Sequence, residues 1–271
     1  MIVAVDTGGT KTLVASFLED GSIGEQFKFP TPKTTDEYIS VLVGALREHF
    51  LGKPVDCLVV AMPGIVENGV AIWCNQLEWK NFDVATALHG VLGGVPILVE
   101  HDGNLGGLGE ARQLDDIPSL VYYVTVSTGI GSGIITDGVI NQALRHSEAG
   151  RTLVEFDGKV REWETFASGK AIKTVYKKYA KDITSARTWH QIADRISRGL
   201  LATIPVLQPD VIIIGGSMGV FFDKYAKDLR AILKAHLPPH IPTPVISKAK
   251  HPDEAVIYGC YYYALDNLIA V

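Results

Sequence analysis

Apolar residues along this chain follow two repeating patterns, one typical of buried strands and one typical of amphipathic helices. Short continuous apolar runs, such as residues 211–214, predict strands that are buried on both faces. In residues 35–51, Tyr38, Leu42 and Leu46 recur at helical spacing, which predicts a helix with one apolar face. The same reasoning predicts strands at 2–6, 12–18, 25–29, 57–61, 95–100, 121–126, 134–136 and 211–214, and helices at 35–51, 103–112, 165–181, 188–204 and 253–267. Because strands and helices alternate without long linkers, we expect an α/β fold.

The first apolar run ends in a turn that could bring backbone N–H groups against an anion. Glycines carry no Cβ, so the chain can turn tightly and let phosphate oxygens approach. A threonine hydroxyl and a lysine would add donors, and an aspartate could hold a hydrated Mg²⁺. The candidate phosphate-binding residues of this turn are Asp6, Gly8, Gly9, Thr10 and Lys11. An ordinary two-strand turn is the alternative interpretation.

A second glycine-rich turn lies about 120 residues further along the chain. Residues 127–133 spell Ser-Thr-Gly-Ile-Gly-Ser-Gly between two apolar runs, and Asp137-Gly138 then predicts a hairpin. The candidate phosphate-binding residues here are Thr128, Gly129 and Gly131. Two glycine turns at this spacing indicate a duplicated unit. Such a pair of turns resembles the two-lobed actin-like and sugar-kinase fold, a duplicated ribonuclease H-like fold with a cleft between the lobes.

Composition narrows the class of protein. A length of 271 residues is natural for two lobes, and 47% apolar with 20% charged residues is typical of a soluble globular protein. The net charge of −5 gives no reason to expect a nucleic-acid partner. Because apolar runs are too short for a membrane span and the glycine turn begins so early, we expect neither a membrane partner nor a signal peptide. Three cysteines, odd in number, favour reduced thiols and a cytoplasmic location.

Further motifs are spread over nearly the whole chain. They include Pro-Gly-Ile-Val at 63–66, Asn-Gln-Leu-Glu-Trp at 75–79, Asp-Gly-Asn at 102–104, Gly-Glu at 109–110, Glu-Ala-Gly at 148–150, Glu164 with Ala-Ser-Gly at 167–169, Gly-Gly at 215–216, and Ala255 with Gly259. In this order and spacing, the motifs resemble those of the ROK sugar kinases (repressor, open reading frame, kinase).

The resemblance implies transfer of the terminal phosphoryl group of Mg·ATP to a hydroxyl of a hexose or hexosamine, with glucose as the commonest acceptor. It implies an N-terminal lobe at 1–116 and a C-terminal lobe at 117–271, with 255–271 packing back on the first lobe; the Asp-Asp-Ile-Pro break at 115–118 suggests the hinge. Gly215 and Gly216 would hold adenosine, although glycines there could also serve only close packing. Homodimers are common among such relatives, and nothing in this sequence establishes one.

Asp102 is the candidate catalytic base. It follows a predicted strand, and ligands bind beyond the carboxyl ends of strands in open α/β sheets. A carboxylate there could accept the proton of the attacking sugar hydroxyl. Taken alone, the position would also suit a helix N-cap, and the family resemblance favours the base. His101 replaces the first Asn of the family's Asn-Asp-Ala-Asn motif, a residue that contacts the sugar in relatives, so the identity of the sugar stays open.

The resemblance assigns the remaining sugar contacts to Gly64, Asn75, His101, Glu148, Arg151 and Glu164, beside Asp102. Relatives carry a zinc-ligating His where this chain has Arg151, and cysteines where residues 152–163 have neither Cys nor His. We therefore expect no structural zinc. Arg151 is expected at the sugar end, where it donates to a sugar hydroxyl or pairs with Glu148 or Glu164. An exposed arginine that points to solvent is the alternative.

The phosphoryl donor and the activity itself have alternatives. Polyphosphate-dependent glucokinases of this family are also short and zinc-free, and Lys170, Lys173, Lys177 and Lys181 would form one basic face of the helix predicted at 165–181. A solvated helix face is the plainer interpretation of these lysines. Part of the family represses transcription through an N-terminal helix-turn-helix, but here the phosphate motif begins at residue 6. A degenerate sugar-binding protein is a third reading, suggested by His101 and Arg151.

Overall fold

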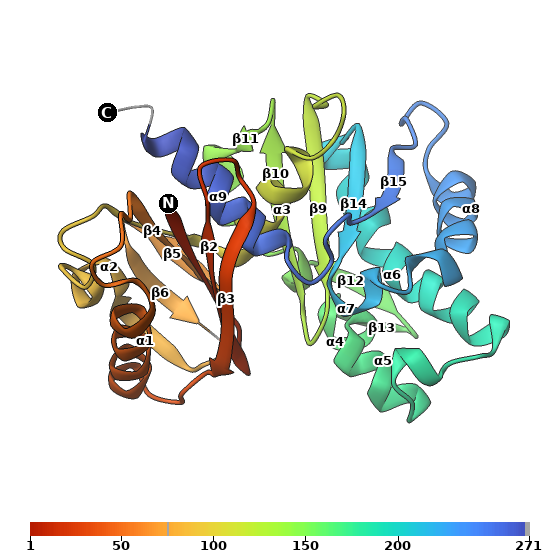
Figure 1. Ribbon diagram of the computed structural model, residues 1–271. Coiled ribbons are helices and arrows are strands. Elements are labelled where there is room, and N and C mark those ends of the chain that lie inside the picture. The colour runs from red at the N-terminus through yellow and green to blue at the C-terminus, as the bar shows by residue number, and fades with distance from the viewer. Residues whose placement is uncertain (75, 269–271) are drawn as a thin grey trace. The chain divides into compact units, whose positions relative to one another are not determined.

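The structure, a computed structural model, describes residues 1–74 and 76–268. The chain divides into two compact units, shown in Figure 1. Unit 1 comprises residues 1–109 together with 256–271, and unit 2 comprises residues 110–255. The first and the last described segments of the chain therefore belong to the same unit.

The sheet of unit 1 has five strands in the order β3-β2-β1-β4-β8. Their bounds are β1 Ile2–Thr7, β2 Lys11–Phe17, β3 Ile23–Pro30, β4 Cys57–Met62 and β8 Ile97–His101. The first three strands pair antiparallel, and β1, β4 and β8 are parallel. The predicted strands at 2–6, 12–18, 25–29, 57–61 and 95–100 are therefore confirmed to within two residues at each end.

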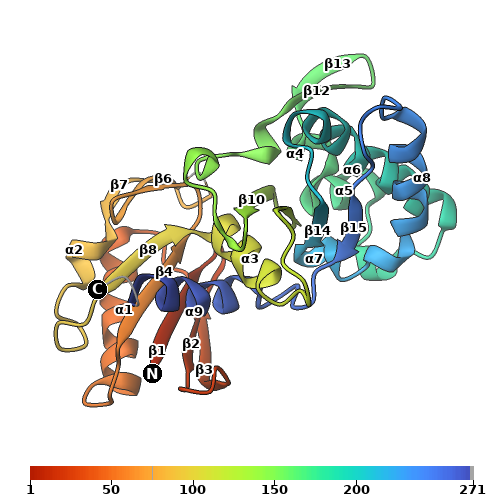
Figure 2. The same ribbon diagram turned by 90° about the horizontal axis from the view of Figure 1, so that it is seen from above.

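Helices cover both faces of this sheet. Helix α1 (Thr35–Phe50) buries the apolar face that the spacing predicts, and Tyr38 and Leu42 join the same core as Val3 and Val5. Helix α9 (Ala255–Leu268) runs beside β1 and β2 in Figures 1 and 2, and the ring of its Tyr261 stacks on that of Phe17 at 4.8 Å. These two helices hold the strand ends from which the candidate site is built.

Helix α9 also packs closely on α3 (Asp102–Ala111), the helix that follows β8. A Cβ at Gly259 would lie 1.8 Å from the carbonyl oxygen of Leu105, so only glycine permits this approach. The contact gives the last helix a fixed position against the helix that carries Asp102.

Unit 1 contains a second sheet of three strands that the sequence analysis did not predict. Its strands are β5 (Ile65–Glu67), β6 (Val70–Cys74) and β7 (Trp79–Asp83), followed by the short helix α2 (Val84–Leu88). These strands are short and mix polar with apolar residues, so their periodicity is weak.

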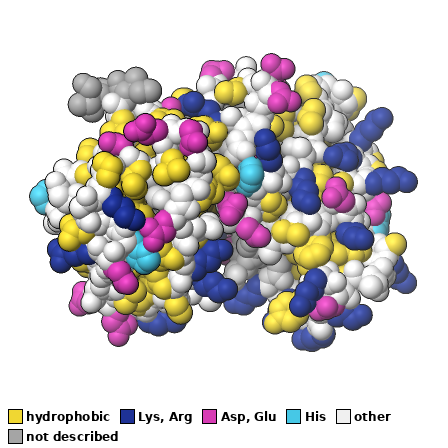
Figure 3. Space-filling view, in the orientation of Figure 1, with side chains coloured by type: hydrophobic (Ala, Val, Ile, Leu, Met, Phe, Trp, Pro, Cys, Tyr) yellow, Lys and Arg dark blue, Asp and Glu magenta, His cyan; other side chains and the backbone are white. Residues whose placement is uncertain are grey.

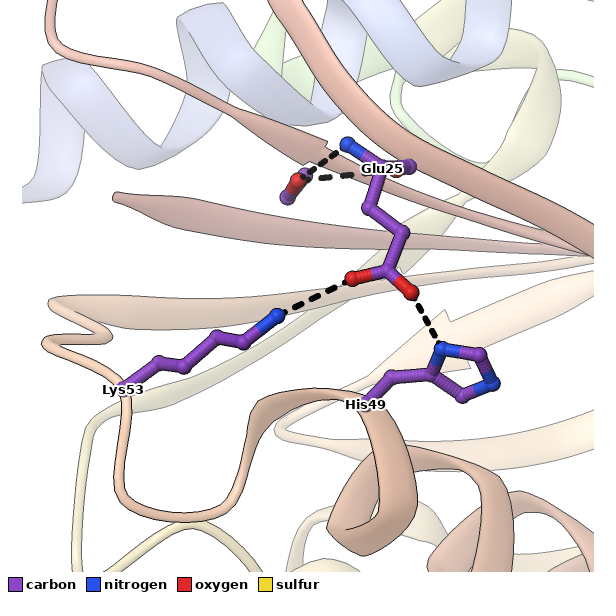
Figure 4. Close-up of polar contacts among 4 residues, drawn as sticks. Glu25, His49 and Lys53 are labelled. Carbon is purple, nitrogen blue, oxygen red and sulfur yellow. Dashed lines mark hydrogen bonds and ion pairs between the residues drawn. The ribbon is translucent and has the colours of Figure 1, made fainter.

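A polar cluster joins the edge strand β3 to the end of α1 (Figure 4). The Glu25 carboxylate accepts a hydrogen bond from Lys53 at 3.0 Å and contacts the His49 ring. These hydrogen bonds, from His49 first and then Lys53, lower the pKa of Glu25. Charged side chains at a sheet edge also discourage pairing with another chain.

The sheet of unit 2 repeats the arrangement of unit 1, with the order β11-β10-β9-β14-β15. Its strands are β9 (Leu120–Val126), β10 (Ile130–Thr136), β11 (Val139–Ile140), β14 (Val211–Gly215) and β15 (Val245–Lys248). Again three antiparallel strands are followed by two parallel ones. The duplication predicted from the two glycine turns is therefore confirmed. The predicted Asp137-Gly138 hairpin is also present, with positive φ at both residues.

Helices α6 (Ala186–Leu207) and α8 (Ala226–His236) pack with this sheet in one core. Figures 1 and 2 show both helices beside β14 and β15. Ile192 and Ile196 of α6 and Leu229 of α8 join the same core as Ile212 of β14. The remaining elements of unit 2 are the hairpin β12 (Leu153–Phe156) and β13 (Lys159–Glu162), and the short helices α4 (Glu164–Ala167), α5 (Gly169–Tyr176) and α7 (Gly216–Gly219).

The single helix predicted at 165–181 is wrong. Ser168 separates α4 from α5, because its hydroxyl caps α5 by accepting the N–H of Ala171. Helix α5 then ends at Lys177, which has a left-handed φ of 56°. Lys177 and Lys181 therefore do not share a helix face with Lys170, and the predicted basic face is shorter than expected.

Among the described residues, no helix combines the length and the apolar character that crossing a membrane requires.

Candidate functional site

The first glycine turn connects β1 to β2, and two hydrogen bonds hold its shape. The N–H of Gly8 donates to the carbonyl of Lys11 at 3.0 Å, and the Thr31 hydroxyl donates to the carbonyl of Gly8 at 2.7 Å. A Cβ at Gly8 would lie 2.9 Å from the carbonyl oxygen of Lys11, so this position requires glycine, whereas a Cβ at Gly9 would meet the movable side-chain oxygen of Gln76 at 2.8 Å. Thr10 and Lys11 remain exposed. The turn is preorganised and open toward a ligand, as the sequence predicts for a phosphate site.

Asp6 lies near the end of β1, beside this turn, and is partly buried. Burial first, and then the charge of Asp102, raise the pKa of Asp6 to about 7, against a smaller opposing effect of Lys28. A cation near these two carboxylates would relieve their repulsion. Hydrated Mg²⁺ fits this setting, because it keeps several waters and needs only one or two carboxylates together with phosphates.

Asp102 lies where β8 passes into α3. Its Oδ1 accepts the N–H of Gly103 at 2.7 Å and lies 3.0 Å from Nε2 of His101. The buried Glu100 supports this junction, since its Oε1 accepts the His101 N–H at 2.8 Å and the Asn104 amide at 3.0 Å. Among the described residues, the bonds of Asp102 all go to Oδ1, and its side chain is 33% exposed. One carboxylate oxygen, Oδ1, is therefore fixed, and no described residue bonds the other, Oδ2.

Asp102 and Glu100, the two acids of this junction, can be compared with what the sequence predicts. Asp102 is itself the first residue of α3 and accepts the N–H of the next residue, Gly103, which is not the bond to an N–H two or three residues on that an N-cap makes. Glu100 was not predicted to contribute, although an acid in an apolar strand was a visible signal.

Gly64 follows β4 at the turn into β5 and has a φ of +86°. A Cβ there would lie 1.9 Å from the carbonyl oxygen of Trp73, so this position requires glycine. Asn75, the neighbouring sugar-side candidate, lies outside the described residues.

The second glycine turn connects β9 to β10, and Ser127 holds it to two other segments. The Ser127 N–H donates to the carbonyl of Gly129 at 2.9 Å, which closes the turn. Its carbonyl accepts the N–H of Gly169 at 2.7 Å, and its hydroxyl accepts the N–H of Ser217 at 2.9 Å. Ser127 therefore joins the turn to the starts of α5 and α7. Ser127 is not among the residues predicted for the site, although it is the first residue of the Ser-Thr-Gly-Ile-Gly-Ser-Gly motif.

Gly215 and Gly216 end β14 and lie directly against this turn. Gly216 has a φ of +72°, and a Cβ there would lie 2.6 Å from the hydroxyls of Ser127 and Thr125. At Gly215 a Cβ would lie 2.3 Å from the Tyr123 hydroxyl. Close packing thus explains both glycines, and it brings them beside Thr128, Gly129 and Gly131, the three phosphate candidates of unit 2.

The sugar-side candidates of unit 2 meet around Arg151. Its Nη1 lies 2.6 Å from Oε2 of Glu162 and 3.1 Å from Oε1 of Glu164. The predicted pairing of Arg151 with Glu148 or Glu164 is therefore confirmed for Glu164. Partial burial lowers the pKa of Arg151, but the hydrogen bond to Glu162 and the charges of Glu164, Glu162 and Glu148 outweigh this, so its pKa is raised.

Glu162 was missed from the sequence. It ends β13, a strand of the hairpin that the sequence analysis did not predict. Only that hairpin turns Glu162 toward Arg151, eleven residues earlier.

The two units differ in charge. With histidine neutral, unit 1 carries six Lys and Arg against fourteen Asp and Glu, a formal charge of −8. Unit 2 carries nineteen against sixteen, a formal charge of +3. In Figure 3, Lys and Arg side chains gather over the part of unit 2 where Figure 1 places α5 and α8. An excess of positive charge suits a unit that receives an anionic ligand.

A model of the ROK family matches residues 2–267. Kanosamine kinase from Amycolatopsis mediterranei (strain S699) is 30% identical over 245 residues, 79% of this chain and 79% of that protein.

Solved structures share the fold. A ROK family glucokinase from Streptomyces griseus, in complex with glucose and AMPPNP, matches with a TM-score of 0.82 at 21% identity, over 98% of this chain and 99% of that one. An inorganic polyphosphate/ATP-glucomannokinase from Arthrobacter sp. strain KM matches with a TM-score of 0.76 at 26% identity, over 98% of each chain. The predicted α/β fold of the actin-like, sugar-kinase type is confirmed.

Proposed function

The chain belongs to the ROK family, and we propose that it transfers the terminal phosphoryl group of Mg·ATP to a hydroxyl of a hexose or hexosamine. The observation that carries this proposal is Asp102, whose Oδ1 is held by two neighbours while no described residue bonds its Oδ2. A base for this reaction needs a fixed carboxylate with one oxygen free to reach the acceptor hydroxyl. Glucose is our first candidate acceptor.

In this mechanism, Asp102 accepts the proton of the sugar hydroxyl as the oxygen attacks the phosphorus. His101 donates through Nε2 to Oδ1, which requires the imidazole proton on that nitrogen, and the Gly103 N–H binds the same oxygen. These two donors keep the carboxylate in one orientation. His101 would then orient the base, whether or not it also contacts the sugar.

The two glycine turns would hold the phosphates through backbone N–H groups. Thr10 and Lys11 add a hydroxyl and a cation in unit 1, and Thr128 adds a hydroxyl in unit 2. Asp6 would hold Mg²⁺ through water, and the bound metal would neutralise charge on the phosphate oxygens. Gly215 and Gly216 pack against the second turn, and the nucleoside would bind beside them.

The acceptor site of unit 2 places three carboxylates around one guanidinium. Glu148, Glu162 and Glu164 all act on Arg151, which leaves an excess of negative charge. Carboxylates accept hydrogen bonds from sugar hydroxyls and attract an ammonium group, but they repel another carboxylate. A neutral hexose or an amino sugar therefore fits better than a sugar acid. The similarity to kanosamine kinase supports this choice. We expect no structural zinc in this acceptor site, because a protonated Arg151 is not a metal ligand.

The test is a panel of sugars with ATP, with formation of ADP and sugar phosphate as the readout. The panel contains glucose, fructose, mannose, glucosamine and N-acetylmannosamine, with glucuronate as the acidic control. We expect phosphorylation of at least one neutral or amino sugar and none of glucuronate. If the folded protein phosphorylates no sugar with any donor, it is a degenerate sugar-binding member of the family, and the proposed activity is wrong.

Inorganic polyphosphate is a second candidate donor. The charge of +3 on unit 2 and the similarity to the polyphosphate/ATP-glucomannokinase favour it. Polyphosphate has no nucleoside, so its use should not depend on the space beside Gly215 and Gly216. The same panel with nucleotide-free polyphosphate separates the two donors.

A further inference from the structure

Three segments of unit 2 meet at the carboxylate of Glu164. Its Oε2 accepts the N–H of Ile130 at 3.2 Å, and Ile130 directly follows Gly129 of the second glycine turn. Its Oε1 lies 3.1 Å from Nη1 of Arg151, and the same nitrogen donates to Glu162 at 2.6 Å. One carboxylate therefore touches the phosphate turn with one oxygen and the sugar-side segment with the other.

The backbone around this carboxylate is packed without spare room. A Cβ at Gly150 would lie 2.3 Å from the carbonyl oxygen of Ile130 and 3.1 Å from Oε2 of Glu164. Further along β10, the Ser132 hydroxyl donates to the carbonyl of Ser147 and accepts the N–H of Ala149, each at 3.3 Å. The segment 147–151 is thus fastened along the start of β10. Because the two segments are closely packed, a movement of either one must displace the other.

We propose that Arg151 is a positioning residue that couples the acceptor side of unit 2 to its phosphate turn. Arg151 holds Glu164 in the orientation in which Oε2 fixes the Ile130 N–H, and Ile130 in turn fixes the end of the turn that contains Thr128 and Gly129. This inference rests on the proposed function and names a regulatory property of the same site: binding of the acceptor and binding of the donor are linked.

The link follows from the acceptor capacity of a carboxylate. Each oxygen of Glu164 has two lone pairs, and one protein donor occupies each oxygen. A sugar hydroxyl can therefore bind Glu164 while both protein contacts persist. Such a hydroxyl would restrain the carboxylate further and make the turn more rigid. By thermodynamic reciprocity, donor binding must then improve acceptor binding by the same factor.

The competing interpretation is that the ion pairs of Arg151 with Glu162 and Glu164 have no effect on ligand binding. Arg151 and Glu162 have side chains that are 39% and 38% exposed, and ion pairs of such exposure contribute little to stability. The low contribution is useful for the test, because replacing Arg151 should leave the protein folded. A structural role alone would then predict no change in ligand binding.

The experiment compares R151M, R151K and the control K159M, which removes an exposed positive charge from the hairpin that carries Glu162. Binding of a non-hydrolysable ATP analogue is measured by calorimetry, without and with saturating glucose, beside the Michaelis constants. We expect R151M to weaken analogue binding roughly 5-fold and to abolish its enhancement by glucose. R151K should recover part of both effects, and K159M should match the wild type.

Two results would overturn the proposal. If R151M raises only the Michaelis constant for the sugar and leaves analogue binding unchanged, Arg151 merely contacts the acceptor. If neither quantity changes, the cluster is a solvated ion pair.

A second readout does not need turnover. Hydrogen exchange of the Ile130 amide should be slow in the wild type and K159M, and clearly faster in R151M. This result would stand even if the sugar panel showed no kinase activity, so failure of the proposed function and failure of the coupling are distinguishable. Unchanged exchange at Ile130 in folded R151M would contradict the coupling.

Discussion

Units 1 and 2 share a strand order but differ in the chemistry of their glycine turns. The turn of unit 1 follows Asp6, whose pKa is raised to about 7 by burial and by Asp102, within a unit of formal charge −8. At the equivalent place in β9, unit 2 has Thr125, within a unit of formal charge +3. Duplicated folds can therefore divide the work of one reaction between their copies.

The difference assigns a role to each unit. Unit 1 concentrates carboxylates, which suits the proposed base Asp102 and the proposed metal-binding residue Asp6 but repels phosphate unless a cation is present. Unit 2 joins its turn to the starts of two helices through Ser127 and packs Gly216 against that turn, and we propose that this turn binds the anionic donor. Substitutions in the two units should thus affect different steps.

The largest effect is expected for D102N in unit 1. Asparagine keeps the shape of the side chain but cannot accept the proton, so turnover should fall by about 100-fold or more. Sugar affinity should be largely retained. Steady-state kinetics check this, with D20N as the control, because Asp20 is an exposed carboxylate in the β2–β3 turn of the same unit. Near-normal turnover of D102N would remove Asp102 from the role of base.

In unit 2, G216A should weaken the nucleotide most. An alanine Cβ would crowd the hydroxyls of Ser127 and Thr125 in a backbone with a φ of +72°. We expect the Michaelis constant for ATP to rise about 10-fold, alongside a loss of roughly 1 to 3 kcal/mol in the free energy of unfolding.

The matched control is G52A, because Gly52 also has a positive φ of +81° but open space around its Cα. G52A isolates the backbone strain from the crowding and should leave the ATP constant unchanged. Equal ATP constants for G216A and the wild type would exclude Gly216 from the donor site.

A further prediction concerns the stability of unit 1 and its dependence on pH. Because the folded-state pKa of Asp6, about 7, lies above its ordinary value of 3.8, this group contributes stability that is full below pH 4 and is lost as pH rises through 7. The D6N substitution removes the ionisable carboxyl group and with it this loss of stability at high pH. Urea unfolding without Mg²⁺ should therefore show D6N gaining roughly 4 kcal/mol on the wild type between pH 4 and pH 8, because the pKa of Asp6 is raised from 3.8 to about 7. If the difference in unfolding free energy between D6N and the wild type does not change with pH, Asp6 ionises normally.

Much of the fold could be predicted because its signals are local. The strands around both glycine turns are continuous apolar runs, and their turns require glycine for reasons visible in the sequence. The helix 165–181 could not be predicted correctly, since the Ser168 cap overrides a helical pattern that continues on both sides. The β12–β13 hairpin was missed because its short strands expose apolar Leu153 and Val160, at 66% and 69%, and so lack a buried face.

The residues of the site could be predicted better than their contacts. Asp102, Arg151 and the glycines belong to motifs, whereas the three bonds of Ser127 depend on segments 42 and 90 residues away as well as on its own turn. The bridge from Arg151 to Glu162 depends likewise on a hairpin that sequence periodicity does not reveal. Contacts of this kind arise from tertiary packing, which a single sequence does not encode locally.

The central claim is the division of work between the units, and one calorimetric comparison tests it most directly. Binding of a non-hydrolysable ATP analogue with Mg²⁺ is measured for the wild type, D102N and G216A. The account predicts that D102N binds the analogue with wild-type affinity although it turns over about 100-fold more slowly, while G216A binds about 10-fold more weakly. If D102N loses the analogue and G216A keeps it, the roles assigned to the two units are wrong.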